Sequence, residues 1–224
     1  MENPKFIKQD DFSKSIDALI ASENEKRSCD ALSESFDSSR ITECPRRLYY
    51  RSIGNVSQNK ISYLEFKHQQ FAKKKWLDVL GHSNKVKIVD ANVEVADCNY
   101  NLTGKIDVIL KCDSEIMLLN IYSLKAEDFE EVKEKGAYKK HAVEIIVNRW
   151  LVEKGESLLI YENRNNSDYI VFHIDLYNYI VEAIKKKCLM LLSHKFRGRT
   201  PSRSYKTNFS KECNNCEFSN ECWK

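Results

Sequence analysis

Four cysteines divided between the two ends of the chain constrain its fold most strongly. Cys44 stands alone in the first part of the chain, whereas Cys213, Cys216 and Cys222 form a compact group close to the last residue. Three thiolates need a fourth ligand to complete a tetrahedral metal site or an iron–sulfur cluster. Cys44 can supply that ligand, so the sequence predicts an inorganic centre that ties the two ends of the fold together.

The identity of that centre stays open on the ligands alone. An all-thiolate set suits a structural zinc ion as well as an iron–sulfur cluster. The other cysteines lack ligand-like spacing, and we expect buried or incidental thiols at Cys29, Cys98, Cys112 and Cys188, the last on the apolar face of a helix.

The sequence shows neither a secretory leader nor a membrane span. Its first residues are polar, and no stretch approaches the roughly 18 apolar residues of a membrane-spanning helix. We therefore expect a soluble, cytoplasmic protein with no membrane partner. In that compartment cysteines bind metals more often than they form disulfides.

Hydrophobic periodicity predicts one α/β domain, residues 41–224, behind a polar N-terminal extension, residues 1–40, with one short helix around 12–20. With 42% hydrophobic residues the chain can bury a sizeable core. Helical spacing predicts a helix that opens near Cys44, with Pro45 in its first turn, and helices over 61–80, 137–153 and 176–195. Short alternating or β-branched runs predict strands over 85–95, 106–110, 116–122, 158–161 and 169–174, the first three consecutive in one sheet. The expected helix caps are Ser39 or Thr42 for the first helix and Asp175 for the last.

This order of elements resembles the PD-(D/E)XK nuclease core, a restriction-endonuclease-like α/β fold with a mixed central sheet flanked by helices. With the divided cysteines it is similar to the RecB-type iron–sulfur branch of that family, closest to Cas4. The resemblance rests on the run Cys44-Pro45-Arg46-Arg47-Leu48-Tyr49-Tyr50, His68 on the helix before the sheet, Gly104-Lys105-Ile106-Asp107, the segment 159–164 and the C-terminal cysteine trio. It implies a [4Fe–4S] cluster held by the four cysteines, Mg²⁺ or Mn²⁺ if the site is active, and DNA ends or single strands as the partner.

The residues expected to cut DNA depart from the family pattern. Asp107 fits the metal-binding aspartate that the family carries on one strand, and His68 would add a metal ligand. On the next strand Asn120 and Tyr122 share one face and stand where the family has an acidic residue and a lysine. An asparagine oxygen holds a divalent cation less well than a carboxylate, and a phenol of pKa ~10 is a poor substitute for an ammonium group. The pattern favours a decayed active site.

Three other side chains offer replacement catalytic groups. Lys125 follows the second of those strands, and a turn there would redirect it toward the site. Glu144 on the next helix offers a carboxylate, and Glu94 on the strand before Asp107 offers another. Asp90 and Asp97 compete with Glu94 for this role. Lys140 and Asn148 lie one turn from Glu144 on the same helix face and could support it.

Clusters of basic and aromatic residues are candidate DNA contacts. The net charge of +3 is too small to indicate a nucleic-acid partner by itself. Local clusters can still neutralise phosphates, and tyrosines can stack on bases of a single strand. The candidates are Arg46, Arg47, Lys73, Lys74, Lys75, Arg164, Arg197, Arg199 and Arg203 for phosphates, and Tyr49, Tyr50 and Tyr205 for bases.

Three functions follow from these observations. The first is a Cas4- or RecB-like DNA-binding protein, phage- or CRISPR-associated, whose active site is degenerate. The second is a working metal-dependent exonuclease with relocated catalytic groups, acting on single-stranded DNA or DNA ends. The third is a non-catalytic protein-interaction subunit of a DNA-processing complex.

Overall fold

The computed structural model describes residue 18 and residues 34–54 and 63–224, and the statements below refer to these. The short helix expected around 12–20 therefore lies almost wholly outside the described residues. None of the described helices has the length and apolarity needed to cross a bilayer.

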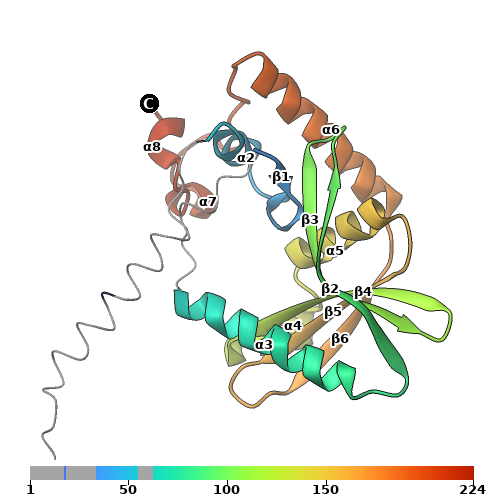
Figure 1. Cartoon of the computed structure of the whole chain (residues 1–224). Coiled ribbons are helices and arrows are strands. Elements are labelled where there is room, and N and C mark those ends of the chain that lie inside the picture. The colour runs from blue at the N-terminus through green and yellow to red at the C-terminus, as the bar shows by residue number, and fades with distance from the viewer. Residues whose placement is uncertain (1–17, 19–33, 55–62) are drawn as a thin grey trace, which may run out of the picture.

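A mixed sheet of six strands forms the centre of the molecule (Figure 1). Strands β2 (Val86–Asp97), β3 (Leu102–Cys112) and β4 (Glu115–Leu124) form an antiparallel meander. Strand β5 (Glu156–Asn163) runs parallel to β4, and β6 (Tyr169–Ile174) returns antiparallel to β5. The meander and the two later strands confirm what alternation and β-branched runs predicted.

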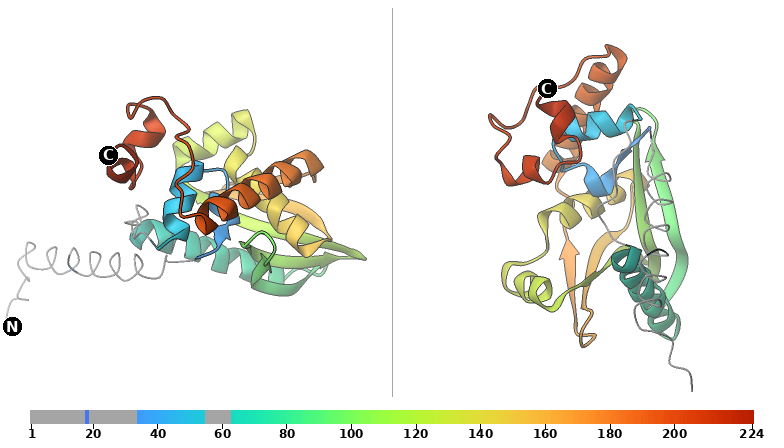
Figure 2. Two further views of the ribbon diagram at one scale, coloured as in Figure 1. Left: turned by 90° about the horizontal axis from the view of Figure 1, so that it is seen from above. Right: turned by 90° about the vertical axis from the view of Figure 1, so that its left-hand side faces the viewer.

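Helices cover both faces of this sheet (Figures 1 and 2). Helix α3 (Tyr63–Gly81) packs on one face, where Trp76 contacts the cluster that includes Leu119. Helices α4 (Ala126–Lys135) and α5 (Lys139–Val152) connect the parallel strands β4 and β5 and cover the other face, where Leu118 and Ile145 share a cluster. Neighbouring residues of β4 thus face opposite cores, because strand side chains alternate.

A second helical layer lies against α5. Helices α2 (Pro45–Ser52) and α6 (Asn178–Phe196) join α5 in a third apolar cluster, in which Leu48, Val147 and Cys188 are buried. Cys188 is fully buried on α6, as predicted. The tail carries the short helices α7 (Lys211–Asn214) and α8 (Ser219–Cys222) and lies beside α2, with Phe218 buried against Tyr50 (Figure 1).

Some predicted boundaries need correction. Pro45 opens α2 as expected, but the N-cap is Cys44 rather than Ser39 or Thr42, and α6 begins after Tyr177 rather than at a cap from Asp175. The strand β1 (Phe36–Asp37) pairs with β3, and the 3₁₀ turn η1 (Ser38–Arg40) follows it. Because Phe36 is buried, the folded domain begins before residue 40, where the polar composition had placed the boundary.

Gly104 in β3 is required by the close approach of α5. A Cβ at this position would overlap the amide oxygen of Asn148 and come within 3.1 Å of the Ser38 hydroxyl. Asn148 is fully buried; it accepts a hydrogen bond from Ser38 Oγ at 2.9 Å and donates one to the Lys105 carbonyl at 2.8 Å. The glycine therefore leaves room for a buried amide that links η1, β3 and α5.

The substitution Gly104→Ala is expected to lower the free energy of unfolding by about 1–3 kcal/mol, since the methyl group must displace Asn148. Gly81→Ala is the matched control, because a Cβ there meets only Ile88 Cδ1 at 4.0 Å. Urea unfolding of both variants measures the difference. Equal stabilities would contradict the account of Gly104.

Candidate functional site

The β3–β4 ladder opens in the middle of the sheet. Its last pair joins Val108 to Leu119. Further back along β3, Leu102 and Thr103 pair with β1 instead. Residues 104–107 lie between these two paired stretches, so side chains have to satisfy backbone groups that a continuous ladder would pair.

Asn120 and Asp107 bridge this opening. Asn120 accepts a hydrogen bond from the Asp107 N–H at 3.4 Å and donates one to the Lys105 carbonyl at 3.3 Å. Asp107 Oδ2 accepts the N–H of Ile121 at 2.8 Å. Both side chains are buried, at 4% exposed for Asp107 and 3% for Asn120. The two residues predicted at the active site therefore also hold two diverging strands together.

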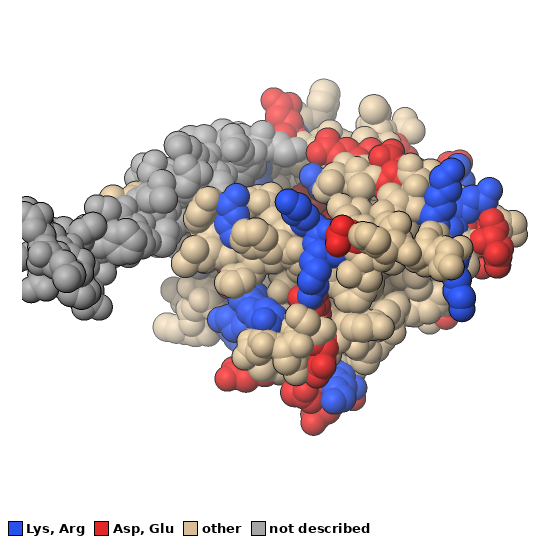
Figure 3. Space-filling view, turned by 60° about the horizontal axis from the view of Figure 1, so that its bottom comes forward, with Lys and Arg blue, Asp and Glu red and all other residues tan. Residues whose placement is uncertain are grey.

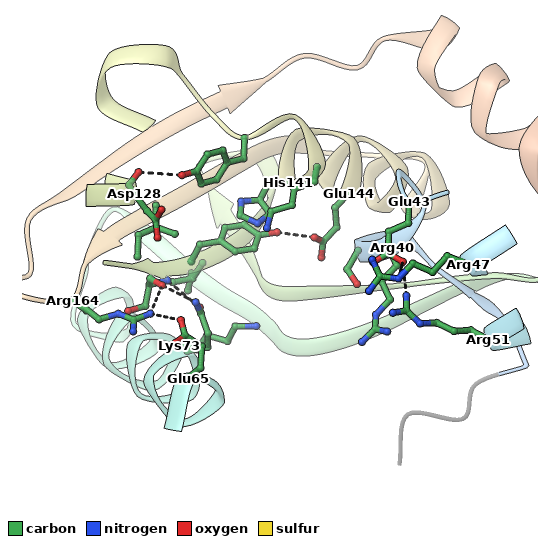
Figure 4. A pocket seen from close by; sticks show the side chains of 18 residues that line it. Arg40, Glu43, Arg47, Arg51, Glu65, Lys73, Asp128, His141, Glu144 and Arg164 are labelled. Atoms are coloured by element: carbon green, nitrogen blue, oxygen red, sulfur yellow. Dashed lines mark hydrogen bonds and ion pairs between the residues drawn. The ribbon is translucent and has the colours of Figure 1, made fainter. Parts of the chain in front are cut away.

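A cleft of about 680 Å³ lies beside the opening (Figure 4). One end of it is lined by Arg40, Arg47 and Arg51, and the other by Glu65 and Arg164, as Figure 4 shows. Its walls come from η1, α2, α3, β4 and α5. The cleft thus joins the first helices of the chain to the end of β4.

Three side chains of α3, each one turn from the next, face this cleft. Glu65 pairs with Arg164 at 2.8 Å. Gln69 donates to the Ser123 carbonyl at 2.7 Å and accepts the Ser123 N–H at 3.0 Å. Lys73 forms an ion pair with Asp107 Oδ1. From the sequence, Lys73 was predicted only as a phosphate contact. Its spacing of four residues from Gln69, and of eight from Glu65, was the signal that the three side chains share a face.

Glu144 of α5 completes the floor of the cleft. It accepts hydrogen bonds from Tyr122 Oη at 2.9 Å and Asn120 Nδ2 at 3.3 Å. Burial raises the pKa of Glu144 to about 7. Burial, followed by the charge of Glu144, raises the pKa of Tyr122. Tyr122 therefore stays a neutral donor and does not supply the ammonium group that the family pattern requires.

An aromatic stack supports Tyr122 from the α5 side. The His141 ring lies parallel to the Tyr122 ring with centroids 3.6 Å apart, and its Nδ1 lies 2.9 Å from Tyr161 Oη. Burial lowers the pKa of His141 to about 3, so the imidazole is neutral. His141, unassigned by sequence analysis, is thus a positioning group for Tyr122.

Three sequence candidates lie away from the cleft lining. The Glu94 side chain is 82% exposed and lies 3.9 Å from Lys105. His68 is exposed on α3, outside the stripe of Glu65, Gln69 and Lys73. Lys125 is the exposed N-cap residue of α4. The structure therefore brings Asp107, Asn120, Tyr122 and Glu144 together and leaves these three outside.

Two arginines and two glutamates separate the cleft from the tail. Arg47 pairs with Glu217 at 2.6 Å and with Glu43 at 3.4 Å. Arg51 pairs with the same two carboxylates, at 2.5 Å for Glu43. Burial alone would raise the pKa of Glu217, but the hydrogen bond from Arg47 lowers it. This network fastens the residue that follows Cys216 to helix α2.

All four predicted cysteine ligands line one pocket of about 450 Å³ between α2 and the tail. The chain thus brings Cys44 to the C-terminal trio, Cys213, Cys216 and Cys222, across the full length of the fold. Each of the four is a free thiol of intermediate exposure. Among the described residues, no group of three or more His, Cys, Asp or Glu side chains is arranged to hold a metal ion.

Basic side chains surround these thiols. Arg46 donates from Nη1 to Cys222 Sγ at 3.3 Å and to the Cys222 carbonyl at 2.9 Å. Lys187 donates to the carbonyls of Ile41 and Glu43, both at 2.6 Å, just before Cys44. Burial raises the pKa of the Cys216 thiol. The four thiols therefore share a pocket with basic neighbours, but their side chains are not arranged around a common metal position.

The predicted DNA contacts divide into four groups. Arg47 and Arg164 line the cleft, whereas Arg46 holds the tail. Tyr49 is buried in the core at 4% exposed, so it is not available to stack on a base. Lys74 and Arg199 are exposed outside the cleft. On the face drawn in Figure 3, basic and acidic side chains are interspersed rather than gathered into one field.

The groups at Asp107 do not fit a divalent cation. Magnesium and manganese need several oxygen ligands that face the ion. One carboxylate oxygen of Asp107 accepts a backbone N–H, and the other accepts a hydrogen bond from Lys73. Asn120 donates a hydrogen bond from its amide nitrogen to Glu144.

Solved structures with this fold include several exonucleases. A protein designated SSO0001 matches with a TM-score of 0.56 and 14% identity over 94% of this chain and 97% of its own. An alkaline exonuclease from Laribacter hongkongensis matches with a TM-score of 0.59 and 10% identity, over 78% of this chain and 93% of its own. A putative exonuclease from Eubacterium rectale matches with a TM-score of 0.54 and 11% identity, over 81% and 87%.

These similarities confirm the predicted α/β fold, a mixed central sheet flanked by helices. The Laribacter exonuclease has also been solved in complex with dAMP, and that complex matches over 74% of this chain with a TM-score of 0.57. No protein-family model matches the sequence, and a search of curated proteins finds no match.

Glu144→Gln is expected to change how stability depends on pH. The Glu144 carboxyl keeps its proton up to about pH 7 in the folded chain but only to about 4.5 when unfolded, so the wild type loses stability as pH rises between these values. The variant lacks this loss, and the difference in unfolding free energy between the two should change by up to about 3 kcal/mol.

Urea unfolding at pH 4.5, 6 and 7.5 measures that difference. His141 has the opposite dependence, because its lowered pKa favours folding as pH rises, but this contribution is common to both proteins and cancels. A difference that stays constant across the range would contradict the proposed environment of Glu144.

Proposed function

We propose that this chain is a Cas4- or RecB-like DNA-binding protein that uses a nuclease scaffold without cutting DNA. The single observation that carries the proposal is the ion pair between Lys73 and Asp107. In a nuclease this aspartate would hold a cation that activates water. Here an internal ammonium already neutralises it, while Glu144 is engaged by Tyr122 and Asn120.

The cleft supports binding of a nucleic-acid backbone. Phosphate neutralisation by Lys and Arg supplies most non-specific affinity for DNA. Acidic side chains in the same cleft offset part of this charge, so we expect modest, strongly salt-dependent affinity. The cleft is lined by the cations Arg40, Arg47, Arg51, Lys73, Lys140 and Arg164 and by the acidic residues Glu43, Glu65, Asp128 and Glu144.

Arg40 is an available cation at the η1 end of the cleft. Among the described residues, no hydrogen bond or ion pair engages its side chain, although it lines the cleft. Burial, followed by the like charge of Arg51, lowers the pKa of Arg40. The negative charge of a phosphate beside Arg40 would offset both costs, so we assign Arg40 the first contact with the DNA backbone.

Arg40→Gln should weaken binding of a fluorescent single-stranded DNA several-fold and reduce the slope of log affinity against log salt by about one. Lys111→Gln is the matched control, since Lys111 lies at the other end of β3 beside a separate hollow. Fluorescence anisotropy at low salt measures both. No binding by the wild type at low salt would exclude DNA binding and favour a protein-interaction role.

The same preparation distinguishes binding from hydrolysis. We expect labelled single-stranded DNA to stay intact with the wild type and Mn²⁺. Degradation that Asp107→Ala abolishes would instead establish the alternative, an active exonuclease with relocated groups.

A protein-interaction role has one observation of its own. Leu189 and Phe196 lie two turns apart on α6, so they share a face, and they are 52% and 93% exposed. Apolar side chains on one exposed helix face are typical of a surface that meets another protein. A partner in a DNA-processing complex is therefore the second candidate function.

We also propose that Cys44, Cys213, Cys216 and Cys222 hold a [4Fe–4S] cluster, with a structural zinc ion as the alternative. The shared pocket and the neighbouring Arg46 support a thiolate centre. When bound, the group would supply a covalent link between α2 and the tail. The network of Arg47, Arg51 and Glu217 then adds a second, electrostatic link.

Anaerobically purified protein should contain about four iron and four sulfide per chain and absorb in the visible range. Cys216→Ser should lose this content, whereas Cys98→Ser should keep it, because Cys98 is exposed outside the pocket. One zinc and no sulfide would establish the alternative. Absence of both metals from the wild type would contradict the proposed centre.

A further inference from the structure

The carboxylate of Asp107 is engaged at both oxygens within the protein. Oδ2 accepts the Ile121 N–H at 2.8 Å, and Oδ1 meets the ammonium of Lys73. The Asp107 side chain is 4% exposed, whereas that of Lys73 is 33% exposed and lines the cleft. An ionised carboxylate is costly to bury without a partner charge. Lys73 supplies this charge and still reaches the cleft.

Contacts on both sides of Lys73 hold α3 in register. Gln69, one turn before it, exchanges two hydrogen bonds with the backbone of Ser123. Trp76, after it, donates its indole N–H to Glu162 at 2.6 Å. Because α3 is fixed to β4 and β5 on either side of Lys73, the docking of the helix places the ammonium beside Asp107.

The neighbouring polar groups leave little for a metal ion to bind. The amide oxygen of Asn120 accepts a hydrogen bond from the Asp107 N–H, and its amide nitrogen donates one to Glu144. Glu144 also accepts the hydroxyl hydrogen of Tyr122. A divalent ion would have to displace Lys73 and break these hydrogen bonds to gain oxygen ligands.

We propose that the ammonium of Lys73 takes the place of a divalent cation in this cleft, neutralising Asp107 and presenting its other N–H groups to a phosphate of DNA. The second part rests on the proposed DNA-binding function. An ammonium group has three donors, so one can serve Asp107 while another faces the cleft. An ammonium group can bind a phosphate but, unlike a metal ion, does not activate water. The same replacement therefore accounts for DNA binding and for the absence of hydrolysis.

Manganese binding to the full chain without DNA tests the first part. Free Mn²⁺ gives an electron paramagnetic resonance signal that disappears on binding, so titration measures affinity directly. We expect Lys73→Ala to bind one Mn²⁺ at least tenfold more tightly than the wild type, because the ion regains the Asp107 carboxylate. The double variant Lys73→Ala, Asp107→Asn should lose this gain.

Lys74→Ala is the matched control, since Lys74 is the adjacent residue, is exposed and lies outside the cleft lining. It should bind Mn²⁺ as weakly as the wild type. If Lys73→Ala does not fold by circular dichroism, Lys73→Ser replaces it. Equal Mn²⁺ affinity for the wild type and a folded Lys73 variant would overturn the proposal.

DNA binding tests the second part. The wild type should bind single-stranded DNA equally in EDTA and in Mn²⁺ at matched ionic strength. Lys73→Ala should bind several-fold more weakly in EDTA and recover when Mn²⁺ is added. A wild type whose affinity depends on Mn²⁺ would overturn the proposal. Failure of every protein to bind DNA would contradict the DNA-binding function alone, because the titration without DNA still decides whether Lys73 excludes the ion.

Discussion

The divergence of β3 from β4 beyond Val108 is the constraint on which the rest of the site depends. An unpaired buried backbone group costs about 1–3 kcal/mol, so a gap in the middle of a sheet must be bridged by side chains. Asn120 and Asp107 do this for the two strands, and Asn148 ties α5 to the same place through the Lys105 carbonyl. The polar residues at this point therefore serve the fold as well as any chemistry.

The bridging role gives Asp107 and Asn120 a structural use that does not depend on any catalytic activity. Asp107 remains necessary because it caps the Ile121 N–H, and its charge remains balanced because Lys73 lies beside it. The cleft remains open, with arginines at both ends. At the end near the tail, Arg47 and Arg51 each form ion pairs with Glu43 and Glu217. The cysteine pocket and the cleft therefore have a common wall.

Much of the fold could be predicted because its signals are local. The alternation over β2 and the Pro45 position each depend on a few neighbouring residues, and both were found. The long-range contacts were not. The burial of Tyr49 depends on α2 packing against α5 and α6, and the pairing of Lys73 with Asp107 depends on how α3 docks on the sheet. The requirement for glycine at position 104 also has a distant cause, the side chain of Asn148.

Anomalous diffraction from crystals grown with Mn²⁺ tests the central claim most directly, since it locates the ion without reference to activity. The account predicts no manganese peak beside Asp107, with the Lys73 ammonium in contact with the carboxylate. A manganese peak between Asp107 and Glu144, with Lys73 displaced, would contradict it.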